Sequence, residues 1–347
     1  MPAFKLARAV LTWHQQHGRH DLPWQQPRTP YRVWVSEIML QQTQVRTAIN
    51  YFEAFVAMFP DLLALAQAPS EQVMQQWAGL GYYSRARNLH KSAQICATQY
   101  GAQLPTRFED LICLPGIGRS TAGAILSQAH GLPFAILDGN VKRVLTRFHC
   151  VEGSLNSSAT SKQLWQLAEI HLPKKDLANY SQAMMDLGAT VCTSRNPNCK
   201  ACPLAKQCQA YQANRVDDFP NKSVRKAIPK RNVYVLLMIN KNNEILLEQR
   251  PNHGIWGGLF SLPEANDLQQ AKTIISQHII RPKTEQFLNS FNHQFSHFQL
   301  CIKPIVWQNC VAKHQIKDNT SLRWVSRQQL AKIGLPAPIK TLLLDLP

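Results

Sequence analysis

The sequence predicts a helical N-terminal domain, residues 1–213, then a basic linker, residues 214–231, and a smaller α+β domain, residues 232–347. Up to about residue 211, short apolar segments with helical spacing alternate with turn signals, and β-branched alternation is scarce. Between Asn221 and Arg231 there are five basic residues, one proline and no acid. After this stretch the apolar period changes toward two, which is typical of strands.

The composition favours a protein with a normal core and an anionic partner. The chain has 347 residues, enough for two or three domains, and 45% of them are hydrophobic, which argues against disorder. Lysine and arginine total 38 against 21 acids, a formal charge of +17. Such an excess points first to DNA or RNA, with generic basicity as the alternative interpretation.

The N-terminal stretch predicts a packed helix rather than a targeting segment. The first acid is Asp21, so residues 1–20 have the charge of an organellar transit peptide. They lack serine, however, and Leu6, Val10 and Trp13 are spaced as on a helix that packs against a core. No apolar run approaches the roughly 20 residues that span a bilayer. Nine cysteines without an export signal indicate a reducing compartment.

Local signals place the elements of both domains. In "PDLLALAQAPSEQVMQQWAGLGYY" we expect a helix with Ser70 as its N-cap that runs to Ala78 and stops at a glycine. In the second domain, "VYVLLMIN", the turn "KNNE" and "ILLEQR" predict a β-hairpin. The segments "FQLCIKPIVW" and "LRWVS" predict further strands, and "RQQLAKIGL" predicts a short helix.

Four clustered cysteines predict a metal centre. The segment "CTSRNPNCKACPLAKQC" contains Cys192, Cys199, Cys202 and Cys208, with gaps of six, two and five residues. Zinc and a 4Fe–4S cluster both accept four thiolates. The single CxxC and the two longer arms favour the bulkier cluster, and zinc is the alternative. The other cysteines are interpreted as small buried side chains: Cys96, Cys113, Cys150, Cys301 and Cys310.

A glycine-rich loop, "LPGIGRSTAGAI", predicts a helix-hairpin-helix over about residues 107–134. It lacks the spacing of a P-loop, and Thr121 stands where a dinucleotide fingerprint needs its third glycine. The preceding "FEDLICLP" is helical in pattern and ends at Pro115, and we expect Gly116 and Gly118 to supply unusual dihedral angles. The next helix then begins with exposed N–H groups that can bind a DNA phosphate.

Two carboxylates lie in informative surroundings. Asp138, in "FAILDGNVKRVLTRF", follows an apolar segment and precedes a helix, so it is an N-cap, a functional carboxylate at the mouth of the hairpin, or both. Glu37, in "YRVWVSEIMLQQTQV", has Val33, Trp34 and Leu40 as helical neighbours. We therefore expect Glu37 to be largely buried, which would raise its pKa and keep it protonated, as an acid catalyst needs.

The hairpin, the aspartate beyond it and the Cys-x6-Cys-x2-Cys-x5-Cys loop together resemble the endonuclease III superfamily of DNA glycosylases, and within it the adenine-specific branch. The resemblance covers nearly the whole chain. It implies a mainly α helix-hairpin-helix glycosylase domain with an iron–sulfur cluster loop at residues 192–208 that holds one 4Fe–4S cluster. It also implies an α+β Nudix-like C-terminal domain.

The resemblance implies roles for the carboxylates. Glu37 would be the general acid that protonates adenine and later positions water. Asp138 would stabilise or trap the oxocarbenium ion, and Asn140 would orient Asp138. Ser120 stands where the endonuclease III branch has a nucleophilic lysine, and a serine cannot form that imine. We therefore expect a monofunctional glycosylase, although Lys142 allows weak lyase activity or, in the alternative interpretation, a phosphate contact.

Further roles also follow from the resemblance. The DNA-phosphate contacts would be Gly116, Gly118 and Ser120. In "LQQTQ" and "GLGYYSRARN", Gln42 and Tyr82 would enter the base stack, while Thr43 and Leu80 would contact the opposite base. For Tyr83 we prefer core packing. The adenine pocket would include Trp24 and Gln182.

The C-terminal "HGIWGGLFSLPE" resembles a Nudix-like domain, but no REUxEE-type motif is present in the sequence, so we do not expect pyrophosphate hydrolysis. In "FNHQFSHFQL", the resemblance implies that Phe295, Ser296 and His297 recognise 8-oxoguanine. An ordinary polar hairpin tip is the alternative interpretation.

Together these features predict base excision repair by hydrolysis of adenine from A opposite 8-oxoguanine, and more weakly from A opposite G, which leaves an abasic site. The expected partner is double-stranded DNA with such a mispair, bound by a monomer, with no membrane and with abasic-site repair enzymes acting downstream. The expected location is the bacterial cytoplasm, at the nucleoid. Two alternatives are a bifunctional pyrimidine-lesion glycosylase, disfavoured by Ser120, and a non-catalytic lesion-binding protein, disfavoured by Glu37 and Asp138.

Overall fold

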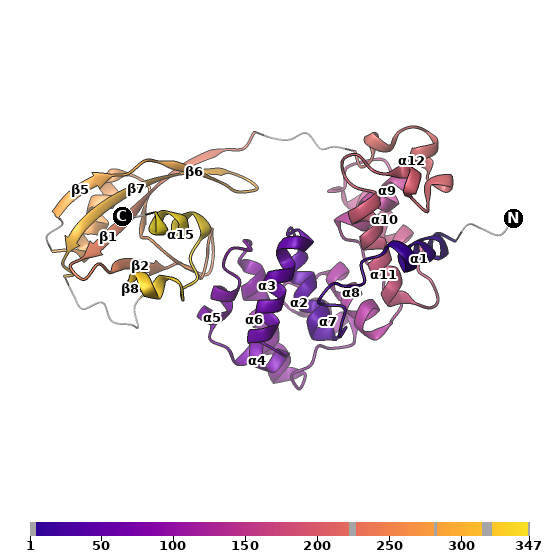
Figure 1. Cartoon of the computed structure of the whole chain (residues 1–347), viewed down its shortest axis with the longest axis horizontal. Helices are drawn as coiled ribbons and strands as arrows, with labels where there is room; N and C mark the ends of the chain where they lie inside the picture. The colour runs from indigo at the N-terminus through magenta and orange to yellow at the C-terminus, as the bar shows by residue number, and fades with distance from the viewer. Residues whose placement is uncertain (1–4, 222–226, 281–282, 314–320, 346–347) are drawn as a thin grey trace. The chain divides into compact units, whose positions relative to one another are not determined.

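The computed structural model describes residues 5–221, 227–280, 283–313 and 321–345. The chain divides into two compact units (Figure 1). Unit 1 comprises residues 1–67 and 88–224, and unit 2 comprises residues 68–87 and 225–347. Of the predicted linker, residues 222–226 lie outside the described residues, while β1 already begins at Lys230.

Unit 1 is built from helices, and α6 crosses its boundary with unit 2. Its α-helices are α1 Leu6–His17, α2 Pro30–Leu40, α3 Val45–Met58, α4 Leu62–Gln67, α6 Ser84–Gln99, α7 Phe108–Cys113, α8 Arg119–His130, α9 Gly139–Phe148, α10 Ser158–Ile170, α11 Leu177–Asp186 and α12 Gln209–Gln212. A π-helical turn, Leu187–Val191, continues α11, and short 3-10 turns follow at Cys199–Ala201, Ala205–Gln207 and Val216–Asp218.

Capping residues fix the ends of the helices that carry candidate site residues. The hydroxyl of Thr29 accepts the N–H of Arg32 at 3.2 Å, and Pro30 opens α2 with its preset φ. Helix α8 ends at Gly131 in the left-handed region, with φ 64°. The apolar faces of α1, α9, α10 and α11 meet in one core, and this core includes Leu6, Val10 and Trp13 from the predicted N-terminal helix.

The segment from residue 68 to residue 87 differs from expectation. Helix α5, Ser70–Gln76, has Pro69 rather than Ser70 as its N-cap and ends two residues before Ala78. The cap is non-helical because the ring of Pro69 fixes φ near −60° while its ψ is extended. Within unit 2 this segment contacts the C-terminal part of the chain: Arg323 pairs with Glu71, and Arg87 donates to the carbonyl of Gly257.

In the C-terminal part of unit 2, the described residues form a mixed eight-stranded sheet flanked by helices. The strands are β1 Lys230–Asn240, β2 Ile245–Gln249, β3 Phe260–Ser261, β4 Glu264–Ala265, β5 Lys283–Phe287, β6 Phe291–Gln294, β7 Gln299–Cys310 and β8 Leu322–Val325. The helices are α13 Leu268–His278, α14 Arg327–Leu330 and α15 Ala337–Leu344.

Strand order agrees with the hairpin that the sequence predicts. The main path is β3-β2-β1-β7-β5, with β4 on β1, β6 on β7 and β8 on β2. Strands β1 and β2 are antiparallel, while β1 and β7 run parallel over ten residue pairs at the centre of the sheet (Figure 1). Leu236, Met238, Leu246, Ile305 and Trp307 form part of the buried core that α13 covers.

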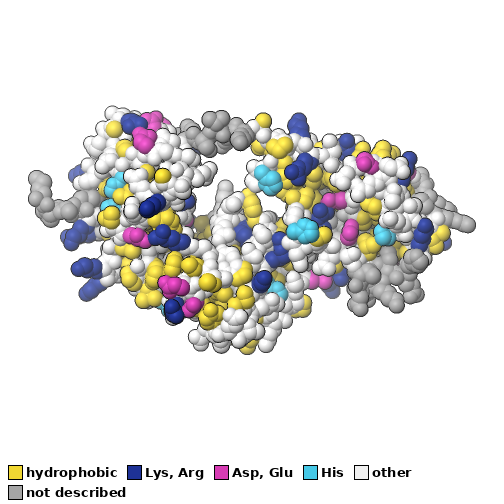
Figure 2. Space-filling view, turned by 180° about the vertical axis from the view of Figure 1, so that it is seen from behind, with side chains coloured by type: hydrophobic (Ala, Val, Ile, Leu, Met, Phe, Trp, Pro, Cys, Tyr) yellow, Lys and Arg dark blue, Asp and Glu magenta, His cyan; other side chains and the backbone are white. Residues whose placement is uncertain are grey.

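The surface carries the positive charge expected from the composition. Figure 2 shows Lys and Arg side chains spread over both units on the face in view, with fewer acidic side chains between them. Among the described residues, no helix has the length and apolar character needed to cross a bilayer.

Candidate active site and cysteine centre

The hairpin has the geometry of a tight turn between two helices. Pro115 follows α7, and its carbonyl accepts a hydrogen bond from Ser92 Oγ of α6 at 2.8 Å. Gly116 has φ +81°, and a Cβ there would lie 2.9 Å from Asn88 Cβ, so the turn needs glycine. Gly118, the N-cap of α8, has φ −93° and ψ 175°. The expectation of unusual dihedrals is therefore wrong for Gly118, because an extended residue suffices to begin α8 there.

Asp138 serves as the N-cap of α9 and leaves its second oxygen to Asn140. Asp138 Oδ1 accepts the N–H of Val141 at 2.8 Å, and Asn140 Nδ2 donates to Asp138 Oδ2 at 2.9 Å. Leu137, the residue before Asp138, is held by α8, because its N–H donates to Ser120 Oγ at 3.0 Å. Both interpretations of Asp138 from the sequence are thus compatible with its position.

Glu37 lies partly buried in α2, beside α8. Gln128 of α8 donates from Nε2 to Glu37 Oε1 at 3.3 Å. Burial raises the pKa of Glu37 to about 8, the charge of Asp138 adds to the increase, and the Gln128 hydrogen bond opposes it. The two carboxylates are therefore close enough to interact electrostatically, and Glu37 stays protonated at neutral pH.

Arg143 connects this site to the cysteine loop. Its NH2 group donates to Asn140 Oδ1 at 2.8 Å, and its Nε donates to the carbonyl of Cys192 at 2.7 Å. Gly188, in the π-helical turn, packs against Asn140: a Cβ on Gly188 would lie 2.6 Å from Asn140 Cβ. Asn140 is held between these groups, so its amide cannot turn away from Asp138 without breaking the contact with Arg143.

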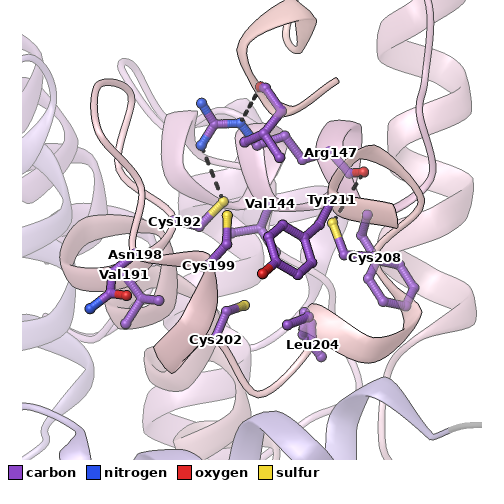
Figure 3. A pocket seen from close by; sticks show the side chains of 13 residues that line it. Val144, Arg147, Val191, Cys192, Asn198, Cys199, Cys202, Leu204, Cys208 and Tyr211 are labelled. Carbon is purple, nitrogen blue, oxygen red and sulfur yellow. Dashed lines mark hydrogen bonds between the residues drawn. The ribbon is translucent and has the colours of Figure 1, made fainter. Parts of the chain in front are cut away.

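The four cysteines of residues 192–208 line one pocket (Figure 3). Arg147 crosses the pocket wall: its NH1 lies 3.4 Å from Cys192 Sγ, and its carbonyl accepts from Cys208 Sγ at 3.5 Å. Burial raises the pKa of Cys202 to about 12 and also raises the pKa of Cys199 and Cys208, so these thiols are neutral until something stabilises the thiolates.

This donor set fits the predicted cluster, because four soft sulfur donors face one space beside a fixed positive charge. The described residues contain no group of three or more His, Cys, Asp or Glu side chains arranged to hold a single metal ion. Of the cysteines outside this loop, Cys96 and Cys310 are buried as expected, Cys150 and Cys301 are only partly buried, and Cys113 is exposed. The expectation of burial is therefore wrong for Cys113, which is the last residue of α7 and remains exposed there.

The residues predicted to enter the base stack have unusual backbones. Gln42 has φ +58° and Tyr82 has φ +48°, both in the left-handed region that non-glycine residues rarely adopt. Tyr82 is 44% exposed, whereas the neighbouring Tyr83 is buried. Leu80 is also buried, and the structure places it with Tyr82 in unit 2, while Gln42 and Thr43 belong to unit 1.

A second pocket, within unit 2, gathers the predicted 8-oxoguanine residues. Phe295, Ser296 and His297 line it together with Tyr82 and Trp256. The three residues form the tip between β6 and β7, where Phe295 N–H donates to the carbonyl of Phe298 at 2.9 Å. The Phe295 ring lies 5.6 Å from that of Trp256.

Both predicted residues of the adenine pocket are buried in unit 1. Trp24 packs edge-on against Phe52, with ring centroids 5.4 Å apart. Gln182 donates from Nε2 to Asp186 Oδ1 at 2.8 Å. Sequence patterns do not indicate the polar partners of the site residues, which are Gln128, Arg143 and Asp186. A weak signal for Asp186 was present, since it lies one helical turn after Gln182.

Comparisons with known proteins identify the family. The HhH-GPD superfamily base excision DNA repair model matches residues 35–169, and a NUDIX domain model matches residues 234–345. The chain is 39% identical over 343 residues to an adenine DNA glycosylase of Buchnera aphidicola subsp. Acyrthosiphon pisum, covering 99% of this chain and 98% of that protein. It is 35% identical to the human adenine DNA glycosylase over 356 residues, covering 84% of this chain and 65% of that protein.

Solved structures agree on the fold of the helical part. A thermostable thymine-DNA glycosylase matches 60% of this chain and 95% of its own, with a TM-score of 0.55 and 28% identity. Endonuclease III in complex with DNA matches 60% of this chain and 94% of its own, with a TM-score of 0.51 and 21% identity, which concerns the fold alone. These findings confirm the predicted fold class, a helix-hairpin-helix domain with a Nudix-like α+β domain. The chain therefore belongs to the adenine DNA glycosylase family of base excision repair enzymes.

Proposed function

We propose that this enzyme is a monofunctional glycosylase that hydrolyses the N-glycosidic bond of adenine opposite 8-oxoguanine, and more slowly opposite guanine. The carrying observation is a buried glutamate with a raised pKa close to a hydrogen-bonded aspartate. Burial and the charge of Asp138 raise the pKa of Glu37 to about 8, while Asp138 accepts hydrogen bonds from Asn140 Nδ2 and the N–H of Val141. Such a pair supplies a proton donor and an anionic stabiliser at one glycosidic bond.

The chemistry begins with protonation of the base. Adenine leaves poorly as an anion, so Glu37 transfers its proton to a ring nitrogen, with N7 the expected acceptor. The C1′–N9 bond then breaks, its electrons go to the base, and the sugar becomes an oxocarbenium ion. Asp138 stabilises or traps this cation, held in position by Asn140. Glu37, now a carboxylate, orients and deprotonates the attacking water.

The absence of strand cleavage follows from Ser120. Its Oγ accepts the N–H of Leu137 at 3.0 Å, and a hydroxyl cannot form the imine that a lyase needs. The product is then an intact strand with an abasic site, which other repair enzymes process.

Extrusion of the adenine is assigned to Gln42 and Tyr82. Their positive φ values are the kind of local strain that structures retain at functional sites. An extruded base costs stacking energy, which side chains inserted into the duplex offset. Recognition of the opposite 8-oxoguanine is assigned to Phe295, Ser296 and His297, because they share a pocket of unit 2 with Tyr82.

The substrate is duplex DNA bound by a monomer. The net charge of +17 suits a polyanion, and the location that follows is the nucleoid of a bacterial cytoplasm, which the similarity to the Buchnera proteins supports. The N–H groups at the start of α8, which follow the N-cap Gly118, would bind a backbone phosphate.

A pair of glycine substitutions tests this phosphate contact. A Cβ at Gly118 would meet nothing within 4 Å, so Gly118→Ala should fold normally. The added methyl group would keep a phosphate away from the N–H groups at the start of α8, so Gly118→Ala should weaken DNA binding about tenfold, the value of one hydrogen bond. Gly116→Ala, with φ +81°, should instead lower the free energy of unfolding by about 1–2 kcal/mol. Unchanged affinity of Gly118→Ala for duplex DNA would refute the contact.

The pocket of the four cysteines is assigned to one 4Fe–4S cluster. When bound, the cluster would be held by the four thiolates and would fix residues 192–208 against α9. We expect purified protein to absorb broadly in the visible and to contain about four iron atoms per chain by elemental analysis. Cys202→Ala should lose most of this iron, and Cys113→Ser, which changes an exposed cysteine outside the pocket, should not. A colourless protein containing zinc would overturn the assignment.

The deciding experiment for the function is a single-turnover assay on a duplex with one adenine opposite 8-oxoguanine. We expect release of free adenine and strand breakage only after alkali. Strand breakage without alkali would point to a bifunctional enzyme. No adenine release, with the metal centre intact, would reject the proposed substrate, and damaged pyrimidines would be tested next.

A further inference from the structure

A buried polar network lies behind Gln182 and is not used by the mechanism above. Its centre is Asp186, which is fully buried at the end of α11. Arg19 donates to it three times: the backbone N–H to Oδ2 at 2.8 Å, Nε to Oδ1 at 2.9 Å and NH2 to Oδ1 at 2.6 Å. His14 Nε2 lies 3.3 Å from Oδ2, and Gln182 Nε2 donates to Oδ1 at 2.8 Å.

The charge state of Asp186 follows from these contacts. Burial alone would raise the pKa of Asp186, but the contact with His14 and the charge and hydrogen bonds of Arg19 outweigh it and hold this pKa below its ordinary value. Asp186 is therefore a carboxylate at neutral pH. A carboxylate only accepts hydrogen bonds, so the amide group of Gln182 must present its NH2 to Asp186.

Because Nε2 of Gln182 faces Asp186, Oε1 of the same amide faces away from Asp186 and can only accept a hydrogen bond. Gln182 is only 2% exposed, and its Oε1 has no hydrogen-bond partner among the described residues. A buried carbonyl oxygen without a partner costs free energy in the unliganded protein. Such an atom is well suited to a ligand that brings a donor.

The neighbours of Gln182 connect to segments that carry other candidate site residues. Ser181 precedes Gln182, and its hydroxyl oxygen lies 2.9 Å from that of Ser127. The residue after Ser127 is Gln128, which donates to Glu37. On the other side of the network, the carbonyl of Arg19 accepts from Gln25, the residue after Trp24. The network thus ties Gln182 to the segments that carry Trp24 and Glu37.

We propose that Asp186 is a positioning residue for base selection, which fixes the Gln182 amide so that Oε1 accepts a hydrogen bond from the 6-amino group of the extruded adenine. The inference rests on the proposed function, because it needs adenine to enter this site. A base with an oxygen at C6 would place two acceptors against each other, and a base with hydrogen there would leave Oε1 unpaired. Sites built around a polar partner reject analogues that lack it.

The test compares two substrates that differ only in the 6-amino group: duplexes with adenine or with unsubstituted purine opposite 8-oxoguanine. Single-turnover rates and binding constants are measured separately for the wild type, Asp186→Asn and Asp176→Asn. Asp176 is an exposed carboxylate at the N-cap of the same helix, so its variant controls for charge. Asparagine tolerates its left-handed φ of 61°.

For each substrate, the single-turnover rate is divided by the dissociation constant, and the value for adenine is compared with the value for purine. We expect Asp186→Asn to lower this adenine-to-purine ratio about tenfold, the effect of one hydrogen bond. Asp176→Asn should keep the wild-type ratio. An equal loss for both substrates in Asp186→Asn, or no loss for either, would overturn the inference, since a role in stability alone does not distinguish the two bases.

A second variant keeps the inference testable if Asp186→Asn does not fold. Gln182→Leu retains the volume of the side chain but lacks the acceptor, and it should lower the same ratio by a similar factor. A wild-type ratio in Gln182→Leu would overturn the inference whatever Asp186→Asn does. Failure of the proposed function itself is distinguishable, because the wild type would then release neither adenine nor purine.

Discussion

Glu37→Gln should retain DNA binding and lose adenine release by about 10³- to 10⁴-fold, since the amide cannot donate the acid's proton to the leaving base. Glutamine has nearly the same shape, so the contacts of α2 with α8 should persist. Single-turnover adenine release and a separate binding assay measure the two effects. Glu53→Gln, an exposed glutamate on α3, is the matched control and should behave as the wild type.

The pH dependence of the wild type should report the same group. With a pKa of about 8, Glu37 is the acid form at neutral pH, so the single-turnover rate should fall about tenfold per pH unit well above pH 8. A rate that rises or stays level across this range, or full activity of Glu37→Gln, would exclude Glu37 as the proton donor.

The free energy of unfolding should also depend on the protonation of Glu37, and it should decrease as the pH rises. The pKa of Glu37 is raised from 4.5 to about 8 in the folded protein, so the folded state binds more protons than the unfolded state between these values. The stabilising contribution is full below about pH 4.5 and is lost as the pH rises to about 8. Thermal unfolding of Glu37→Gln should lack this part of the pH dependence.

Asp138→Asn should reduce adenine release by about 10³-fold, because a neutral amide cannot stabilise the oxocarbenium ion as an anion does. We take this magnitude from the loss of one electrostatic stabiliser in an active site. Its effect on folding should be small, since asparagine caps a helix about as well as aspartate. Asp138→Ala should additionally lower the free energy of unfolding by about 1 kcal/mol through the lost cap.

The matched control for this variant is another capping aspartate. Asp267 caps α13 in unit 2, where its Oδ1 accepts the N–H of Gln270 at 2.7 Å. Asp267→Asn should leave adenine release unchanged. If Asp138→Asn were as active as Asp267→Asn, Asp138 would be a capping residue alone, which is the other interpretation of its place in the sequence.

Features that depend on neighbours along the chain could be predicted from the order of the amino acids alone. The apolar residues around Glu37 place it on a buried helix face, the four cysteines lie within 17 residues, and the alternation after the linker marks β1 and β2. Each of these rests on helical or strand periodicity or on ligand spacing, which are local properties.

The polar groups that hold the site residues could not be predicted in this way, because they come from distant parts of the chain. Gln128 reaches Glu37 across 91 positions, Arg143 reaches Cys192 across 49, and Arg19 reaches Asp186 across 167. Such hydrogen bonds arise because packed helices bring distant residues together and because buried polar atoms must find partners there. Periodicity predicts that Gln182 and Asp186 share one face of α11. The direction of the Gln182 amide follows only from His14 and Arg19, distant residues that together hold Asp186 as a carboxylate.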